Sequence, residues 1–407
     1  MERTGQLGGG LLGALLLVGA ASAPAQEPPL TFPRALDLAV ANNLDLAAAR
    51  RGRAVRQAEV TAAGQHPNPD LVFETTRDTP HQMLSLDVPF EPWKRSRRIG
   101  VAREELALAD VEDAAARQAL RRSVRMAFYG LVAAEEGASL AASMKEVAAR
   151  VREVAQARFD EGAAPRLDVM QADLGVARAS AELELARSAR LSAQAELNGL
   201  LNRPPTQPLA VAGDMAEGAP VPPADQAVAR ATAGNAELRG AEREVTIEDR
   251  RLGLLKAERF PTPVFSLGAV FNAPGEFDAG YRAGLSFAVP LFDRNQGQIA
   301  GSLARADQAR TRRDALRRSV EARAFAAHAR AEAQRAQVAA YRETLVPTAT
   351  TIESLAEEGY KLGRSPVLAV LDAQRSLRDV KTEYLASLLS LQSALADLED
   401  VLGGPIE

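Results

Sequence analysis

Few residues in this sequence have the type and spacing that chemistry on a substrate requires. The 407 residues include no cysteine and three histidines, His66, His81 and His328. A chain without thiols has no thiol nucleophile, no disulfide and no cysteine-based zinc site. The histidines lie far apart, and none has a second ligand at a metal-binding spacing. We find no Ser/His/Asp or paired-carboxylate arrangement either, so we predict no enzymatic activity, no metal site and no cofactor.

The remaining candidates for functional residues are isolated charged side chains next to turns and strands. Asp168 and Asp372 each lie shortly after a turn that combines glycine with proline. A basic cluster follows an alternating apolar segment and consists of Lys94, Arg95, Arg97 and Arg98. Carboxylates can attract cations, and clustered Lys and Arg can meet anionic head groups. Plainer interpretations stay open, because Asp168 suits the first turn of a helix and the basic cluster suits an exposed helix start.

The composition favours long, closely packed helices. The chain has 49 Lys and Arg residues and 53 Asp and Glu residues, which gives a net charge of −4. The chain therefore lacks the positive field that nucleic-acid binding needs, and we predict no nucleic-acid partner. Apolar residues make up 46% and aromatic residues only 4%. The apolar content is thus mainly Ala, Leu and Val, which suits helices better than an aromatic-lined pocket.

An export signal is expected at the N-terminus. One basic residue, Arg3, precedes an apolar run over 11–20, and small residues follow over 21–26. This pattern predicts a signal peptide over 1–25, cleaved after Ala23 or Ala25. No cysteine follows, so we expect no lipid anchor. No later stretch is apolar and long enough for a membrane-spanning helix, so any insertion into a membrane must use strands.

The chain repeats itself at an offset of about 200 residues. Residues 158–172 align with residues 359–373 at an offset of 201, and Val88-Pro89 corresponds to Val289-Pro290. A proline-rich stretch joins the two copies. After the signal peptide we therefore predict a first repeat, a linker and a second repeat, over residues 26–203, 204–223 and 224–407.

Each repeat has the pattern helix, two strands, long helix, turn, long helix. In the last helix of each repeat, apolar residues recur in steps of three and four, the coiled-coil period. The final helix of the chain has a second apolar seam, which predicts neighbours on two sides, as in a closed ring of helices. The long helices are predicted over about 96–160, 166–202, 296–360 and 366–402. An extended coiled-coil stalk with no passage inside is the alternative that the helices alone leave open.

Four segments alternate between an apolar face and a small or polar face, which is the pattern of strands. They are predicted over about 70–78, 82–91, 263–272 and 281–291. If these strands cross a membrane, the lipid-facing positions are Leu84, Leu86, Val88, Phe90, Leu285, Phe287, Val289 and Leu291. Four strands cannot close a barrel, for which about eight are needed, so several chains must contribute. Two hairpins packed on helices in a soluble α+β domain are the other possibility.

Two motifs resemble the TolC-like outer-membrane efflux protein family, and the resemblance covers nearly the whole mature chain. Residues 284–300, GLSFAVPLFDRNQGQIA, look like the strand-to-helix junction of that family, and residues 370–373, VLDA, follow the second turn. The first junction, residues 88–99, is similar to that of the CzcC-like heavy-metal cation-efflux branch, with Pro92 and Trp93 in place of the glycines of that branch. The resemblance implies a mainly α homotrimer. Its two tandem α-β-β-α-α repeats form a helical barrel, and four strands per chain contribute to a 12-stranded membrane β-barrel.

The resemblance also implies roles for the isolated charges and the turns. It places the turns at the periplasmic tip, where three copies of Asp372 form a pore constriction. Asp168 lies in the matching stretch of the first repeat, and the resemblance implies the same role for it. Ala369 stands where the family often has a second aspartate. The tips are expected to dock an adaptor protein through Gly162, Pro165, Arg166, Gly363, Arg364 and Pro366, although plain helix connections would look the same. The membrane-interface anchors are expected to be Trp93, Lys94, Arg95, Arg97 and Arg98.

The function that the resemblance implies is passage through the outer membrane. We expect a passive exit duct in the outer membrane that extends into the periplasm, with divalent metal cations as the first candidate cargo. Its expected partners are a periplasmic adaptor, an inner-membrane pump of the RND type and outer-membrane lipid. The alternative is a non-conducting periplasmic coiled-coil adaptor or scaffold, which would need no strands of bilayer length.

Overall fold

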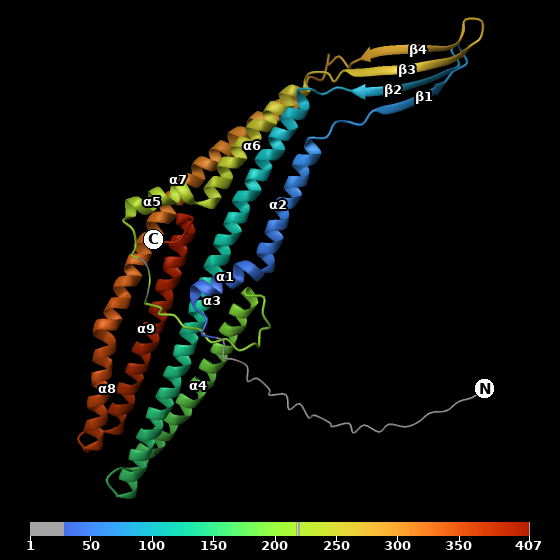
Figure 1. The fold of residues 1–407 in the computed structure, drawn as a ribbon. Coiled ribbons are helices and arrows are strands. Elements are labelled where there is room, and N and C mark those ends of the chain that lie inside the picture. Colours follow the sequence, from blue (N-terminus) through green and yellow to red (C-terminus); the bar gives the residue numbers. More distant parts are fainter. Residues whose placement is uncertain (1–27, 217, 219, 407) are drawn as a thin grey trace, which may run out of the picture.

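Long helices run side by side and a four-stranded sheet extends from one end of them in the computed structural model of the chain (Figure 1). The structure describes residues 28–216, 218 and 220–406, so the predicted signal peptide lies outside the described residues. The first half contains α1 (Phe32–Asn42), α2 (Leu44–Ala63), β1 (Asp70–Thr75), β2 (Gln82–Pro89), α3 (Lys94–Asp160) and α4 (Arg166–Leu200). The second half contains α5 (Ala224–Gly234), α6 (Ala236–Glu258), β3 (Val264–Ala273), β4 (Phe277–Ser286), α7 (Gln296–Ala340), the π-helical turn η1 (Tyr341–Leu345), α8 (Val346–Lys361) and α9 (Val367–Leu402).

Asn43 and Asn235 form the same corner in the two halves. Each caps a helix: its side-chain oxygen accepts the backbone N–H three residues further on, at 3.0 Å in both. Each side-chain nitrogen donates to a carbonyl near the end of a long returning helix, Leu200 at 3.3 Å and Val401 at 3.1 Å. The asparagines thus fasten α2 to the end of α4, and α6 to the end of α9.

The helix that was expected over about 296–360 is interrupted. The structure has α7, then one wide π-helical turn over Tyr341–Leu345, then α8. Pro347 is the second residue of α8, two positions after the last residue of this turn. Proline has no N–H and its ring collides with the carbonyl four residues earlier, so the wide turn accommodates it without ending the helical path. Within the described residues, no helix is both long and apolar enough to cross a membrane.

The core lies midway along the molecule, where the two halves meet. It combines buried residues of α1, α3, α4, α5, α7 and α9. Many of them are alanines, such as Ala35, Ala231 and Ala324, which let helices approach closely. The largest fully buried side chains there include Phe128, Leu131 and Leu398.

A buried arginine joins the two halves within this core. Arg125 of α3 forms an ion pair with Glu399 of α9 at 2.9 Å, and their side chains are 9% and 10% exposed. Arg125 also donates to Gln392, whose amide donates to the carbonyl of Met215 in the linker at 2.7 Å. Arg121 approaches Glu399 at 3.2 Å. One carboxylate therefore contacts two arginines from the other repeat.

The sheet has the order β1-β2-β3-β4, with every pair antiparallel. The two hairpins come from different repeats and pair through β2 and β3, so β1 and β4 are its edges. The last strand was expected over about 281–291 but spans Phe277–Ser286. Its partner β3 begins at Val264, opposite Ser286, and Pro261 and Pro263 precede it. Phe287, Val289 and Leu291 therefore lie beyond the strand pairing.

One face of the sheet is apolar and exposed. The pairing aligns Leu71, Leu86 and Leu267 across three strands, and the next row contains Val88 and Phe265. The residues exposed on this face are Leu71, Phe73, Leu84, Leu86, Val88, Phe265, Leu267, Phe271, Tyr281 and Leu285. The sheet projects beyond the helices (Figure 1), so the helices do not cover this face as a soluble α+β domain would require.

The other face of the sheet is mostly small and polar, although Val72, Met83 and Val270 also lie on it. One row across the strands contains Ser85, Gly268 and Arg282, and the next contains Asp87 and Ser266. The predicted alternation of apolar and polar faces is thus present in the three-dimensional sheet.

Glu399→Gln is expected to destabilise the protein strongly. The change leaves Arg125 buried without its carboxylate, which typically costs about 3–5 kcal/mol. We expect the thermal unfolding midpoint in detergent to fall by at least about 5 °C. Glu184→Gln removes an exposed pair with Arg187 and is the matched control, with a change near zero. Equal midpoints for the two variants would contradict the role given to the buried pair.

Candidate functional site

The two helix hairpins end in turns with the same backbone hydrogen bonds. Gly162 and Gly363 adopt φ of +72° and +71°, a left-handed conformation that glycine tolerates best. In each turn the N–H after the glycine donates to the carbonyl five residues earlier, at 2.8 Å. Pro165 and Pro366 then stand directly before the returning helices α4 and α9. The expected docking residues Arg166 and Arg364 are exposed at these tips.

The first tip contacts the second through Arg158 and Tyr360. Arg158 donates to the Tyr360 carbonyl at 3.0 Å, and its guanidinium lies 4.6 Å from the centre of the Tyr360 ring. Tyr360 is 2% exposed and packs with Val151, Val367 and others. Burial raises the pKa of the Tyr360 hydroxyl, the nearby Asp168 carboxylate raises it further, and Arg158 lowers it. The Asp168 carboxylate of α4 is therefore close enough to the second tip to act electrostatically on the Tyr360 hydroxyl.

Asp372 has different surroundings from Asp168. It lies on α9, its side chain is 59% exposed, and Arg375 lies 3.7 Å away on the same helix. It lines a groove of about 460 Å³ to which α4 contributes residues such as Gly175 and Arg178. At Gly175 the two helices come close, because a Cβ there would lie 3.5 Å from Leu371. Asp168 and Asp372 make no contact with each other in the described part of the chain.

Sequence reasoning missed the arginines of this groove. Arg178, Arg375 and Arg378 line it together with Asp372. Arg378 pairs with Glu182 of α4 at 2.7 Å, and this pair links the two hairpins. The three-residue spacing of Asp372, Arg375 and Arg378 places them on one helix face, and that signal was available in the sequence.

Three of the four residues of the basic cluster hold the junction between helices and sheet. Lys94 donates to the Thr262 hydroxyl. Arg95 donates to the Gly64 carbonyl at 2.6 Å, and Arg98 forms a 2.7 Å ion pair with Glu91. These contacts join the start of α3 to the end of α2 and to the segment before β3. Trp93 and Arg97, by contrast, are exposed.

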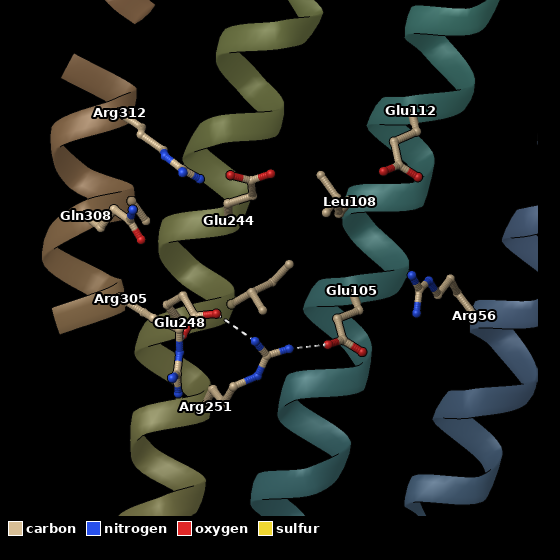
Figure 2. Close-up of a pocket in the computed structure, with 12 residues that line it drawn as sticks. Arg56, Glu105, Leu108, Glu112, Glu244, Glu248, Arg251, Arg305, Gln308 and Arg312 are labelled. Atoms are coloured by element: carbon tan, nitrogen blue, oxygen red, sulfur yellow. Dashed lines mark hydrogen bonds and ion pairs between the residues drawn. The ribbon is translucent and has the colours of Figure 1, made fainter. Parts of the chain in front are cut away.

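A charged groove of about 350 Å³ lies between α2, α3, α6 and α7 and was not foreseen from the sequence (Figure 2). Four arginines and four glutamates line it, so its charges balance. Arg251 bridges Glu105 and Glu248 at 2.9 and 2.6 Å, and Arg305 approaches Glu248 at 3.3 Å. Such half-exposed pairs stabilise by about 0–1 kcal/mol each, so they set helix register more than stability.

Metal-binding geometry is missing from the described part of the chain. No group of three or more His, Asp or Glu side chains there is arranged to hold a metal ion. His66, His81 and His328 accordingly belong to no such group.

Known proteins resemble this chain over almost its whole length. The family model "Outer membrane efflux protein" matches residues 35–203 and 227–404. The cobalt-zinc-cadmium resistance protein CzcC of Cupriavidus metallidurans is 27% identical over 379 residues, which are 92% of this chain and 90% of that protein. This similarity to a heavy-metal resistance protein agrees with the expected resemblance to the heavy-metal branch.

Solved structures share the fold. One is CusC, whose crystal structures concern folding and transmembrane channel formation. It has a TM-score of 0.78 at 16% identity, and the alignment covers 92% of each chain. The outer membrane protein VceC of Vibrio cholerae has a TM-score of 0.75 at 18% identity, covering 92% of this chain and 97% of VceC. The expected fold class is confirmed. The family model matches most of both halves, and the chain belongs to the outer membrane efflux protein family.

Proposed function

We propose that three copies of this chain form the outer-membrane exit duct of a tripartite efflux system. Membership of the family makes the chain an outer-membrane efflux protein. The observation that supports a trimeric duct most directly is the sheet, which has two unpaired edges, β1 and β4, and an exposed apolar face.

The unpaired edges require further strands. A backbone N–H or C=O without a partner costs several kcal/mol in lipid, so an open edge cannot remain there. Three copies supply twelve strands, above the smallest practical number of about eight. The apolar face then meets lipid, and the face with Ser85, Asp87 and Arg282 lines the passage. Phe287, Val289 and Leu291 extend the lipid-facing surface beyond the end of β4.

The sheet and the hairpin tips lie at opposite ends of the molecule (Figure 1). With the sheet in the outer membrane, the tips reach into the periplasm. There the exposed turns around Gly162 and Gly363 are placed to dock a periplasmic adaptor, which links the duct to an inner-membrane pump of the RND type. We also propose the repeat boundaries 26–203 and 224–407, each repeat supplying one hairpin of strands and one tip.

The tip aspartates are proposed to select the cargo by charge. Three exposed Asp372 carboxylates around one axis would attract cations. Arg375 offsets part of this charge, but an exposed pair at 3.7 Å is weak. The name of the relative CzcC refers to cobalt, zinc and cadmium resistance, which supports divalent cations as the cargo. A periplasmic scaffold is the second candidate, and the exposed apolar sheet face argues against it.

Assembly and conduction test the duct directly. The protein purified from outer membranes is expected to cross-link to a trimer and no further. In planar bilayers it should give stepwise currents. A monomer without current would refute the duct and favour the scaffold.

Charge variants at Asp372 test the constriction. Asp372→Asn should weaken cation selectivity, and it should raise the Co²⁺ concentration for half-maximal current block roughly tenfold, equivalent to about 1.4 kcal/mol. Arg375→Gln should shift both quantities in the opposite direction, because it unmasks the carboxylate. Asp225→Asn in α5 removes a charge far from the tips and is the control. If the Asp372 and Asp225 variants behaved alike, Asp372 would have no role in the constriction.

A further inference from the structure

We propose that a groove between α3 and α6, next to the sheet, binds the phosphate of an anionic glycerophospholipid. The inference rests on the proposed placement of the sheet in the outer membrane. The groove has a volume of about 570 Å³ and joins the two repeats. Its lining includes Trp93, Arg97, Leu252, Gly253, Lys256 and Phe260.

Two cations in this groove have no protein partner among the described residues. Arg97 and Lys256 make no hydrogen bond or ion pair there, unlike Lys94, Arg95 and Arg98 on the adjoining turn. The acid of the groove, Asp249, is already paired with Arg310 of α7 at 2.6 Å. The groove therefore presents two cations against one carboxylate that is already shared with a third cation, Arg310. A phosphate supplies the missing charge and accepts hydrogen bonds from both groups.

Gly253 brings the two cations together. A Cβ at this position would lie 3.3 Å from a terminal guanidinium nitrogen of Arg97. The Arg97 side chain thus extends from α3 across the groove onto α6. Lys256 is three residues further along α6, on the same face of that helix. Both cations accordingly line one site, although 159 positions separate them in the sequence.

Aromatic residues occupy the end of the groove nearest the sheet. Trp93 and Phe260 are 53% and 60% exposed and stand at the helix ends that join the strands. The cations lie about one helical turn further from the sheet, roughly 5 Å along the axis. Phe90 and Phe265 follow at the adjoining ends of the sheet strands, three residues before Trp93 and five residues after Phe260 in the sequence, and their exposed rings have centroids 6.1 Å apart.

Aromatic residues next to the sheet, followed by cations one helical turn further away, match the parts of a lipid at the membrane boundary. Acyl chains would lie along the aromatic end and the sheet, and the phosphate would reach the cations. A net negative head group is favoured because two cations face one phosphate. A soluble anion would use the cations but gain nothing from the exposed rings of Trp93 and Phe260, and therefore a lipid is the occupant we infer.

Lipid binding to the assembled, delipidated protein tests the proposal. Phosphatidylglycerol binding is measured by native mass spectrometry, with phosphatidylcholine and inorganic phosphate as separate arms. The double variant Arg97→Gln, Lys256→Gln should lose roughly thirtyfold in phosphatidylglycerol affinity, since each cation near a membrane surface contributes about 1 kcal/mol. The control Arg103→Gln, Lys145→Gln removes the same charge from exposed positions of α3 and should bind as the unaltered protein does.

The outcomes separate this inference from the duct itself. Equal phosphatidylglycerol affinity in the two double variants would overturn the site, as would equal binding of phosphatidylcholine. Inorganic phosphate that displaces phosphatidylglycerol at low millimolar concentration would show an anion site without lipid recognition and would also overturn it. Conductance is recorded on the same samples: unaltered protein without current refutes the duct, whereas conducting protein with unchanged lipid affinity refutes only the lipid site.

Discussion

Unsatisfied backbone groups at β1 and β4 are the constraint on which the rest of this structure depends. A four-stranded sheet with an apolar face exposed on residues such as Leu71, Phe265 and Leu285 is unstable in water and incomplete in lipid. The proposed closure by identical copies would resolve both problems, because the edges would pair with each other and the apolar face would turn outward. The long helices would then continue the same ring away from the membrane.

The internal repeat explains how one chain supplies an arc of such a ring. Asn43 and Asn235 make matching corners, and the two tips share their backbone hydrogen bonds. Each repeat contributes one hairpin of strands, and β2 and β3 join them. At mid-length Arg125 and Glu399 hold the halves together at a fixed position. A buried ion pair is costly to misplace, so it specifies the alignment of the halves as well as stabilising it.

Local periodicity in the sequence predicted most elements, while features that depend on distant partners were out of its reach. The two-residue alternation and the Gly-Pro turns indicated the strands and tips. The limits of β4 depend on where β3 begins, and the wide turn before Pro347 is a packing solution. The basic cluster looked uniform in sequence, yet Arg95 and Arg98 have structural partners, whereas Arg97 has none among the residues that the structure describes. The sequence of the cluster does not contain these differences, because the partners lie outside it. The groove that Arg97 and Lys256 line could not be predicted from the sequence for the same reason.

Disulfide trapping between β1 and β4 tests the central claim most directly. The chain has no cysteine, so single residues of the two edge strands can be replaced by cysteine in pairs without background. We predict that, in outer membranes, some pairs between Leu71–Phe73 and 279–283 form disulfides that link copies into dimers and closed trimers on a non-reducing gel. Pairs that place one cysteine in the interior strand β2 should stay monomeric. Only monomers across the whole scan would contradict a ring closed by identical copies.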